Sequence, residues 1–244
     1  MNLLIIQARM GSSRLPGKVL MKVDNKPLLK FMIDRVRKSK LVDKIIIATT
    51  EDPKDDPIAM FCKENSIDFH RGSENDVLDR FYQAAKLYNP ETVIRLTADC
   101  PLVDPEFIDK TIELYHKNNV DYAANTVPPE LKKYPDGSDV EVFKFSALQR
   151  AWEESTDPKD REHVTFYFWK HGKNFTTAML DNEFDWGKYR ITIDYKEDFI
   201  VVEKIIKKLK EQGKEGTINE IIEVLQNNPE IKNINSNYTW GMNW

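Results

Sequence analysis

Cationic and small side chains crowd one short stretch near the start of the chain, LLIIQARMGSSRLPGKVL at residues 3–20. An apolar run, Leu3 to Ile6, is followed by a loop that carries Arg9, Gly11, Ser12, Ser13, Arg14, Pro16, Gly17 and Lys18. Small residues let backbone N–H groups approach phosphate oxygens, and the cations neutralise their charge. The loop therefore predicts a site for a polyanion such as a triphosphate. The alternative is an ordinary basic turn of an α/β domain.

The loop differs from the Walker A pattern, G-x-x-x-x-G-K-[ST], in two ways. Five residues rather than four separate Gly11 from Gly17. Lys18 is followed by Val19, so the hydroxyl group that would hold Mg²⁺ is missing. A phosphate site here is therefore of another type.

Two aspartates follow predicted strands. Asp99, in TADCPL at residues 97–102, comes after the strand Thr92–Leu96. Because Mg²⁺ uses few protein carboxylates and shares its shell with phosphate and water, we interpret Asp99 as a metal ligand rather than as a turn cap. Asp194, in RITIDYKED, could supply a second carboxylate to the same ion. It could equally be a helix N-cap whose capping box Glu197 completes.

Other polar clusters leave alternatives open. Asp139 and Glu141 share one face of a predicted strand, either the solvent face of an edge strand or the wall of a polar pocket. Arg161 and His163 lie together at a helix start, where His163 could bind an anionic substrate or serve the structure alone. Arg71 could face a base or a phosphate.

A nearby helix carries Asp76, Asp79 and Arg80, which we expect to be surface charges, one of which could reach the site.

The composition limits the class of protein. The chain has 244 residues, 41% hydrophobic and 31% charged, with a net charge of −4, which argues against a general nucleic-acid-binding surface. It shows neither a signal-peptide pattern nor a run near the roughly 18 apolar residues of a membrane span. We therefore expect a cytoplasmic protein with no membrane partner. Cys62 and Cys100 form no metal or disulfide pattern, and we expect packed, reduced thiols.

Apolar strands alternate with helical segments through the first 125 residues. The predicted strands are Leu3–Gln7, Lys44–Thr49, Ile67–His70, Thr92–Leu96 and Val120–Ala124. The predicted helices are Pro27–Ser39, Asp56–Asn65, Asn75–Tyr88 and Pro105–Asn118, the last with Asp104 as N-cap. This alternation predicts an α/β fold with a mainly parallel sheet covered on both faces. Ligands bind such sheets at the carboxyl ends of the strands, where Arg9–Lys18 and Thr97–Pro101 both lie.

The second half of the chain is less regular. The predicted strands are Asp139–Phe143, Phe175–Leu180 and Tyr189–Ile193. The predicted helices are Ser146–Ser155, Asp160–His171, Glu197–Gln212 and Thr217–Asn227. We expect one domain, with a nucleotide-binding half at about 1–125, an acceptor or dimerisation half at about 126–210, and a C-terminal helix and tail at 211–244. Trp240 and Trp244 of the tail are expected to dock rather than remain free.

Six motifs together resemble a known family. In this order, QARMGSSRLPGK, RGSENDVLDRFYQAA, RLTADCPLVDP, YPDGSDVEVF, REHVT and ITIDYKED resemble the cytidylyltransferases of spore-coat polysaccharide biosynthesis. That family is related to the 3-deoxy-manno-octulosonate and acylneuraminate cytidylyltransferases. The resemblance spans about residues 2–205. Gln7 stands where the sugar-acid enzymes usually have proline, and their acceptor-binding residues do not map cleanly, so the acceptor is not carried over.

The resemblance implies a Rossmann-like nucleotidyltransferase fold, a homodimer, and Mg²⁺-dependent transfer of CMP from CTP to a small acceptor with release of pyrophosphate. Of the implied site residues, the catalytic ones are Arg14, Lys18 and Asp99, and the metal ligands are Asp99 and Asp194. The nucleotide-binding residues are Gln7, Ala8, Arg9, Gly11, Ser12, Ser13, Arg14, Lys18, Arg71, Thr97 and Ala98. Our acceptor-site candidates are Asp139, Glu141, Arg161 and His163. The alternatives are a nucleotidyltransferase that uses another nucleotide, and a nucleotide-binding subunit without activity.

Overall fold

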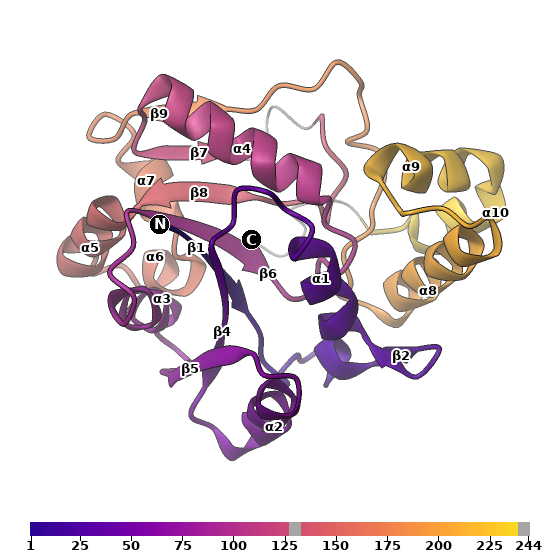
Figure 1. The fold of residues 1–244 in the computed structure, drawn as a ribbon, viewed down its shortest axis with the longest axis horizontal. Coiled ribbons are helices and arrows are strands. Elements are labelled where there is room, and N and C mark those ends of the chain that lie inside the picture. Colours follow the sequence, from indigo (N-terminus) through magenta and orange to yellow (C-terminus); the bar gives the residue numbers. More distant parts are fainter. Residues whose placement is uncertain (127–132, 239–244) are drawn as a thin grey trace.

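A seven-stranded sheet forms the centre of the molecule, with helices on both of its faces (Figure 1). The computed structural model describes residues 1–126 and 133–238, so the expected docking of Trp240 and Trp244 lies outside the described residues. The strand order is β5-β4-β1-β6-β8-β7-β9. The strands are β1 (Asn2–Gln7), β4 (Lys44–Thr50), β5 (Asp68–Gly72), β6 (Thr92–Thr97), β7 (Tyr122–Ala124), β8 (Glu141–Lys144) and β9 (Thr177–Met179). A separate hairpin joins β2 (Lys22–Val23) to β3 (Lys26–Pro27).

Strand β1 is the central strand of the parallel half of the sheet. It pairs in parallel with β4 on one side and with β6 on the other, and β4 pairs in parallel with β5. Its residues Leu3 to Ile6 have no solvent exposure, and alternate residues enter two separate hydrophobic cores. Burial on both faces explains the continuous apolar run. β8 lies antiparallel between β6 and β7, so it is an interior strand.

The helices divide between the two faces of the sheet. One core contains apolar residues of α1, α2, α4, α8 and α9, and the other contains those of α3, α5 and α7. The helices are α1 (Leu28–Val36), α2 (Asp56–Glu64), α3 (Val77–Lys86), α4 (Pro105–Asn118), α5 (Phe145–Glu154), α6 (Pro158–His163), α7 (Phe166–Lys170), α8 (Lys196–Glu211), α9 (Ile218–Asn227) and α10 (Pro229–Lys232). Single turns of 3₁₀ helix are η1 (Lys18–Leu20), η2 (Pro53–Asp55) and η4 (Asn233–Asn235).

The α/β class, the mainly parallel sheet and every element predicted in the first half are confirmed, with ends that shift by a few residues. The predicted helix Asp160–His171 is wrong as a single helix. Val164, with φ of 59° and ψ of −60°, departs from helical geometry and ends α6 before α7 begins.

The predicted strand Tyr189–Ile193 is also wrong. Ile191 and Ile193 are buried, as the alternation indicated, but the backbone pairs with loops instead of a sheet. The N–H groups of Ile191 and Thr192 donate to the carbonyl of Asp136, and that of Ile193 donates to the carbonyl of Asp99. Only an isolated bridge between Asp136 and Arg190 is strand-like.

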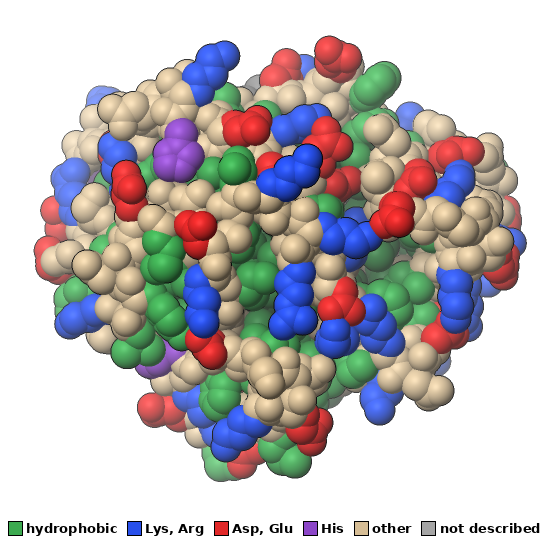
Figure 2. All heavy atoms as spheres, viewed as in Figure 1, with side chains coloured by type: hydrophobic (Ala, Val, Ile, Leu, Met, Phe, Trp, Pro, Cys, Tyr) green, Lys and Arg blue, Asp and Glu red, His purple; other side chains and the backbone are tan. Residues whose placement is uncertain are grey.

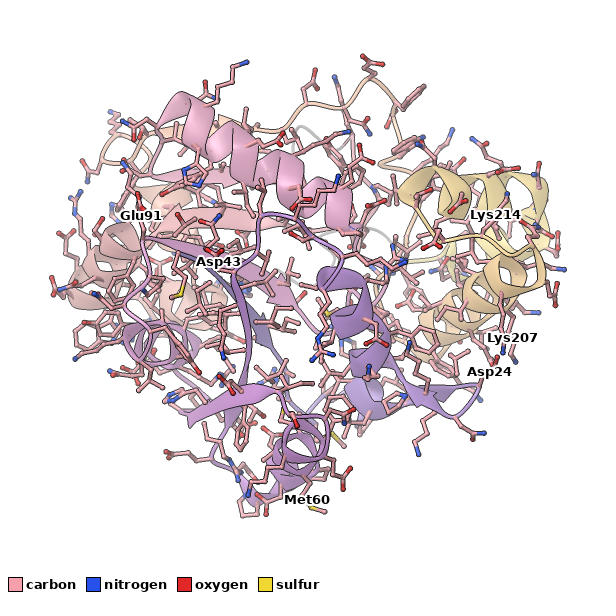
Figure 3. All side chains as sticks on the ribbon, viewed as in Figure 1. Asp24, Asp43, Met60, Glu91, Lys207 and Lys214 are labelled. Atoms are coloured by element: carbon pink, nitrogen blue, oxygen red, sulfur yellow. The ribbon has the colours of Figure 1, made fainter. Side chains whose placement is uncertain are left out.

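The C-terminal helices form a layer beside the sheet. The chain's last helices, α8 to α10, lie together at one side of the molecule (Figure 1). On the exposed side of α8, Lys210 Nζ lies 2.6 Å from Asp24 Oδ2 in the β2–β3 turn, and Figure 3 shows Asp24 near Lys207 of the same helix. Acidic and basic side chains are interspersed over the face drawn in Figure 2. Within residues 1–126 and 133–238, no helix is long and apolar enough to cross a membrane.

Asp104 connects the C-terminal layer to the sheet. Its side chain is the predicted N-cap of α4, accepting from Glu106 N at 2.8 Å, and it also accepts from Ile218 N at the start of α9 at 2.6 Å. The residue is buried, so both N–H groups depend on this one carboxylate.

Asp104→Ala should therefore lower the free energy of unfolding by about 1–3 kcal/mol, because two N–H groups lose their acceptor. Urea denaturation followed by circular dichroism measures the change. Glu113→Ala, at an exposed position of the same helix, is the control and should stay within ~0.5 kcal/mol of wild type. Equal stability of the Asp104 variant and the control would show that the double cap contributes nothing.

Candidate active site

A cleft of about 440 Å³ opens at the carboxyl ends of β1 and β6. Most of the residues singled out from the sequence line it, brought together from segments far apart in the chain. These are Gln7, Ala8, Arg9, Ser12, Ser13, Arg14, Lys18, Thr97, Ala98, Asp99, His163 and Asp194. The shared edge expected for the loops after the two strands is therefore what the structure shows.

The loop after β1 is held at both of its ends. Met10 donates its N–H to Asp55 Oδ1 at 2.6 Å, and its carbonyl accepts from Ser12 N and Gly17 N, both at 2.9 Å. Gly17 has φ of 71°, a left-handed conformation that glycine adopts without strain, and η1 begins at the next residue. The small residues therefore form a tight turn whose start and end are fixed, and Lys18 enters the cleft from a rigid position.

Lys18 is the most enclosed cation of this loop. Its side chain is 11% exposed, and Nζ donates to Asp99 Oδ2 at 3.0 Å, to Asp194 Oδ1 at 3.0 Å and to the carbonyl of Ile193 at 2.6 Å. Two carboxylates that are distant in sequence thus converge on one ammonium group.

The charges of this cluster reinforce one another. Burial by itself would lower the pKa of Lys18, but the carboxylates of Asp99 and Asp194 outweigh it and the pKa is raised. Burial would likewise raise the pKa of Asp99, but Lys18 and a hydrogen bond from Thr97 lower it to about 2. Lysine and aspartate therefore both stay charged around neutral pH.

Asp194 is not a helix N-cap, so that alternative is wrong. Tyr195 is the N-cap of α8, and Asp198, not Glu197, completes the box. The side chain of Asp194 instead accepts from Arg14 Nη2 at 2.8 Å and from Arg190 Nη2 at 3.0 Å, in addition to Lys18. Its carboxylate faces the cleft in a fixed orientation.

Asp99 and Asp194 are the residues that could hold a metal ion. Among the residues described, no three His, Cys, Asp or Glu side chains form a cluster of metal-binding geometry. Two converging carboxylates suit Mg²⁺, which takes one or two of them and completes its shell with phosphate oxygens and water. The donor set therefore fits Mg²⁺ only together with a phosphate ligand.

The other end of the cleft has a polar floor. Arg95 lines it from the middle of β6, donating from Nη2 to Gln7 Oε1 at 3.2 Å and pairing through Nη1 with Glu141. Tyr122 donates its hydroxyl to Glu141 Oε1 at 2.6 Å. Glu141 is buried in an interior strand, so the edge-strand alternative is wrong. Its carboxylate balances Arg95 beneath the cleft and does not line it.

Several candidates lie outside the lining of the cleft. Arg71 donates to the carbonyls of Thr50 and Asp52 and pairs with Asp56, which joins β5 to the start of α2. Arg161 pairs with Asp76 at 2.7 Å and donates to the carbonyls of Trp152 and Ser155 at the end of α5.

Asp139 is half-buried and accepts from Gly137 N at 3.1 Å. Gly11 belongs to the cleft loop but not to the lining.

Two further arginines, Arg80 and Arg95, line the cleft. Arg80 is 2% exposed, so it is not a surface charge but the one of the three helix charges that reaches the site, and it donates to the carbonyl of Ser73. Burial, together with the nearby Arg9, lowers its pKa to about 10. Arg95 was not among the predicted site residues. For Arg95 the sequence did hold a signal, because a charged residue interrupts the buried apolar run TVIRLT. Arg80 gave no such signal, because it occupies an amphipathic helix rich in charge.

His163 is the acceptor-site candidate that does line the cleft. Its ring stacks on Phe166, with centroids 4.2 Å apart. Burial lowers its pKa, so the imidazole is neutral at physiological pH and offers one N–H donor and one acceptor nitrogen. Cys62 and Cys100 are free and buried, as expected.

Comparison with known sequences gives one family match and close relatives of similar length. Residues 3–237 match the family model described as "Cytidylyltransferase". An uncharacterized protein of Methanocaldococcus jannaschii is 40% identical over 96% of this chain and 93% of its own length. The spore coat polysaccharide biosynthesis protein SpsF of Bacillus subtilis is 34% identical over 93% of this chain and 95% of its own length.

Comparison with solved structures agrees with the family match. A cytidylyltransferase from Leptospira borgpetersenii serovar Hardjo-bovis superposes with a TM-score of 0.87 at 33% identity, over 95% of this chain and 96% of that one. CMP:2-keto-3-deoxy-manno-octonic acid synthetase complexed with CTP superposes with a TM-score of 0.66 over 85% of this chain and 98% of that one. At 15% identity, the second similarity shows the shared fold alone.

Lys18→Met should raise the pKa of Asp99 from about 2, because the cation that does most to lower it is removed while burial, which raises it, remains. A carboxyl whose folded pKa is depressed stabilises the fold above its unfolded pKa, ~3.9, and this contribution disappears as the pH falls toward 2. The variant should show a smaller acid-dependent loss. Carbon-13 NMR titration of the aspartate carboxyls measures the pKa, with the exposed Lys22→Met as control. An Asp99 pKa that stays near 2 in Lys18→Met would contradict the assigned cause.

Proposed function

The chain belongs to the cytidylyltransferase family, and from this premise we propose that it transfers CMP from CTP to a sugar acid, a sugar phosphate or a related acceptor. It is an enzyme, a nucleotidyltransferase. The observation that carries the proposal is the position of Lys18, an enclosed cation between Asp99 and Asp194 at the end of a glycine- and serine-containing loop. Such a cluster matches what a triphosphate with a divalent cation requires.

The proposed reaction is a displacement at the α-phosphorus of CTP. An acceptor oxygen forms the new P–O bond, the bond to the β-phosphate breaks, and pyrophosphate leaves with its electron pair. Arg14 and Lys18 bind the β- and γ-phosphates and stabilise the leaving group. Within residues 11–13, the N–H groups of Gly11 and Ser13 contact the triphosphate, because that of Ser12 donates to the carbonyl of Met10. Lys18 remains protonated throughout, because its raised pKa favours the ammonium form.

We assign the metal site to Asp99 and Asp194, which would hold Mg²⁺ together with the phosphates. When bound, the ion withdraws charge from the phosphate oxygens. The contributions of the protein are to orient the two carboxylates and to keep Lys18 next to them. Catalysis of this kind depends mainly on positioning and on fixed charge.

The acceptor is proposed to occupy the end of the cleft formed by Gln7, Arg95 and His163. The neutral imidazole of His163 suits a hydroxyl group, and Arg95 suits an anionic group. The name of the Bacillus subtilis relative supports surface-polysaccharide synthesis as the purpose of the product. A 3-deoxy-manno-octulosonate cytidylyltransferase of Pelobacter propionicus, 32% identical over 44% of this chain, supports a sugar-acid acceptor. The homodimer and the cytoplasmic location stay predictions.

Pyrophosphate release in the presence of Mg²⁺ tests the proposal. CTP, UTP, GTP and ATP are each combined with pooled sugar acids, sugar phosphates and phosphorylated polyols. We expect release with CTP and one class of acceptor. Preference for another nucleotide would overturn the assignment of cytidylyl transfer to this site. Measurable binding of CTP without release from any pool would favour a nucleotide-binding subunit.

Lys18→Ala should reduce kcat/KM by at least roughly tenfold, a barrier increase of ~1.4 kcal/mol, because the leaving pyrophosphate loses its enclosed cation. Steady-state kinetics with the preferred substrates measures the change. Lys22→Ala removes an exposed lysine a few residues further along and should behave as wild type. Unchanged kinetics of Lys18→Ala would exclude Lys18 from the mechanism.

A further inference from the structure

The last described residues of the chain pack against the segment that contributes Asp194 to the cleft. The turn η4 and the residues after it contact the start of α8 and the segment that carries Asp194. Asn235 is 3% exposed, although it is polar and stands close to the end of the chain. A buried amide group in such a position has to be hydrogen-bonded, and its partners indicate what it does.

Asn235 donates to the group that fixes Asp194. Its Nδ2 lies 2.8 Å from Asp198 Oδ1 and 3.2 Å from the carbonyl of Arg190. Asp198 has no solvent exposure, and its Oδ2 accepts from the backbone N–H of Asp194 at 2.9 Å and of Tyr195 at 3.0 Å. Asp198 therefore sets the backbone position of Asp194.

Arg190 fixes the side chain of Asp194. Its Nε donates to Asp198 Oδ1 and its Nη2 to Asp198 Oδ2, each at 2.9 Å. Nη2 also donates to Asp194 Oδ2 at 3.0 Å. The guanidinium group thus contacts three carboxylates, because Nη1 also pairs with Asp136, and it meets both oxygens of Asp198. Because Asn235 shares Oδ1 of Asp198 with Arg190, its amide group belongs to the network that holds the Asp194 carboxylate, alongside Arg14 and Lys18.

A second contact supports the same region. The ring of Tyr238 stacks on that of Tyr195, with centroids 3.9 Å apart and planes at 4°, and its hydroxyl group lies 3.2 Å from Glu197 Oε2. On its other side, the Tyr195 ring lies 5.2 Å from the guanidinium carbon of Arg14, which itself donates to Asp194. The C-terminal segment is thus connected to Asp194 by two sets of contacts, one through Asp198 and one through Tyr195 and Arg14.

We propose that Asn235 is a positioning residue for Asp194, acting through Asp198 and Arg190, and that the C-terminal segment 233–238 thereby completes the metal- and triphosphate-binding site. This inference rests on the proposed function, because it assigns to Asp194 a role in holding the divalent cation. Without the Asn235 amide group, the fully buried Asp198 loses one donor, and its contact with Arg190, which helps to keep Asp194 directed into the cleft, is less well defined.

The test compares Asn235→Ala and Asn235→Asp with Asn237→Ala, an exposed asparagine two residues further along. Binding of Mn²⁺ in the presence of a non-hydrolysable CTP analogue is followed by the electron paramagnetic resonance signal of free Mn²⁺. We expect Asn235→Ala to weaken Mn²⁺ binding about tenfold or more, the usual size of such effects. Metal-free binding of the analogue, measured in EDTA, should change much less. Asn237→Ala should match wild type in both.

The isosteric Asn235→Asp separates positioning from packing. It keeps the shape of the side chain but replaces the donor by an oxygen that faces Asp198. A positioning role predicts that Mn²⁺ binding is at least as weak as in Asn235→Ala, with an Mg²⁺ requirement in the transfer reaction shifted upward by the same factor. If either folded Asn235 variant binds Mn²⁺ as wild type does, the inference is overturned while the proposed function stands.

Two further results complete the test. If the Asn235 variants do not fold, Tyr238→Ala, which removes only a partly exposed ring, replaces them and should weaken Mn²⁺ binding in the same direction. Wild-type Mn²⁺ binding at Tyr238→Ala would then overturn the inference. If wild type itself binds the CTP analogue but no Mn²⁺, the proposed metal site fails and the inference fails with it. Failure of pyrophosphate release alone, with Mn²⁺ binding intact and weakened in the variants, would leave the inference supported.

Discussion

The contact of one ammonium group with two carboxylates, Lys18 with Asp99 and Asp194, is the constraint on which the rest of the site depends. A largely buried lysine is costly unless its charge is compensated, and removing one partner of a buried ion pair typically costs 3–5 kcal/mol. Compensation here requires three chain segments to meet: the loop after β1, the turn after β6 and the residues before α8. The sheet supplies the first two positions because its parallel strands end at one edge. The third depends on the network around Arg190 and Asp198.

This arrangement divides the cleft by charge. At one end, the loop cations and two converging carboxylates provide both signs of charge that a triphosphate and a divalent cation would require. At the other end, Arg95 is neutralised by Glu141 beneath it, and His163 is uncharged, so that end is polar with little net charge. Such a division suits transfer from a highly charged donor to a smaller acceptor that carries hydroxyl groups and less negative charge. The fixed positions of these groups reduce the reorganisation that the reaction needs.

The sequence was most informative where local chemistry decides the structure. Continuous apolar runs and helix caps such as Asp104 located the elements of the first half, and the strand ends located Asp99 and the phosphate loop. It was least informative where long-range contacts decide. Tyr189–Ile193 has the alternation of a strand but hydrogen-bonds to loops. Arg71 and Arg161 have the right type for anion binding but are occupied by Asp56 and Asp76. Asn235 is an ordinary polar residue in an asparagine-rich tail, and only its folded neighbours, Asp198 and Arg190, give it significance.

The most direct test of the central claim is a crystal structure of the protein with CTP and Mn²⁺, in which anomalous scattering locates the metal. The account predicts a Mn²⁺ ion bonded to carboxylate oxygens of both Asp99 and Asp194, with the triphosphate against residues 9–18 and Lys18 within hydrogen-bonding distance of it. A metal ion bound elsewhere, or a triphosphate that leaves Lys18 paired only with the two aspartates, would contradict it.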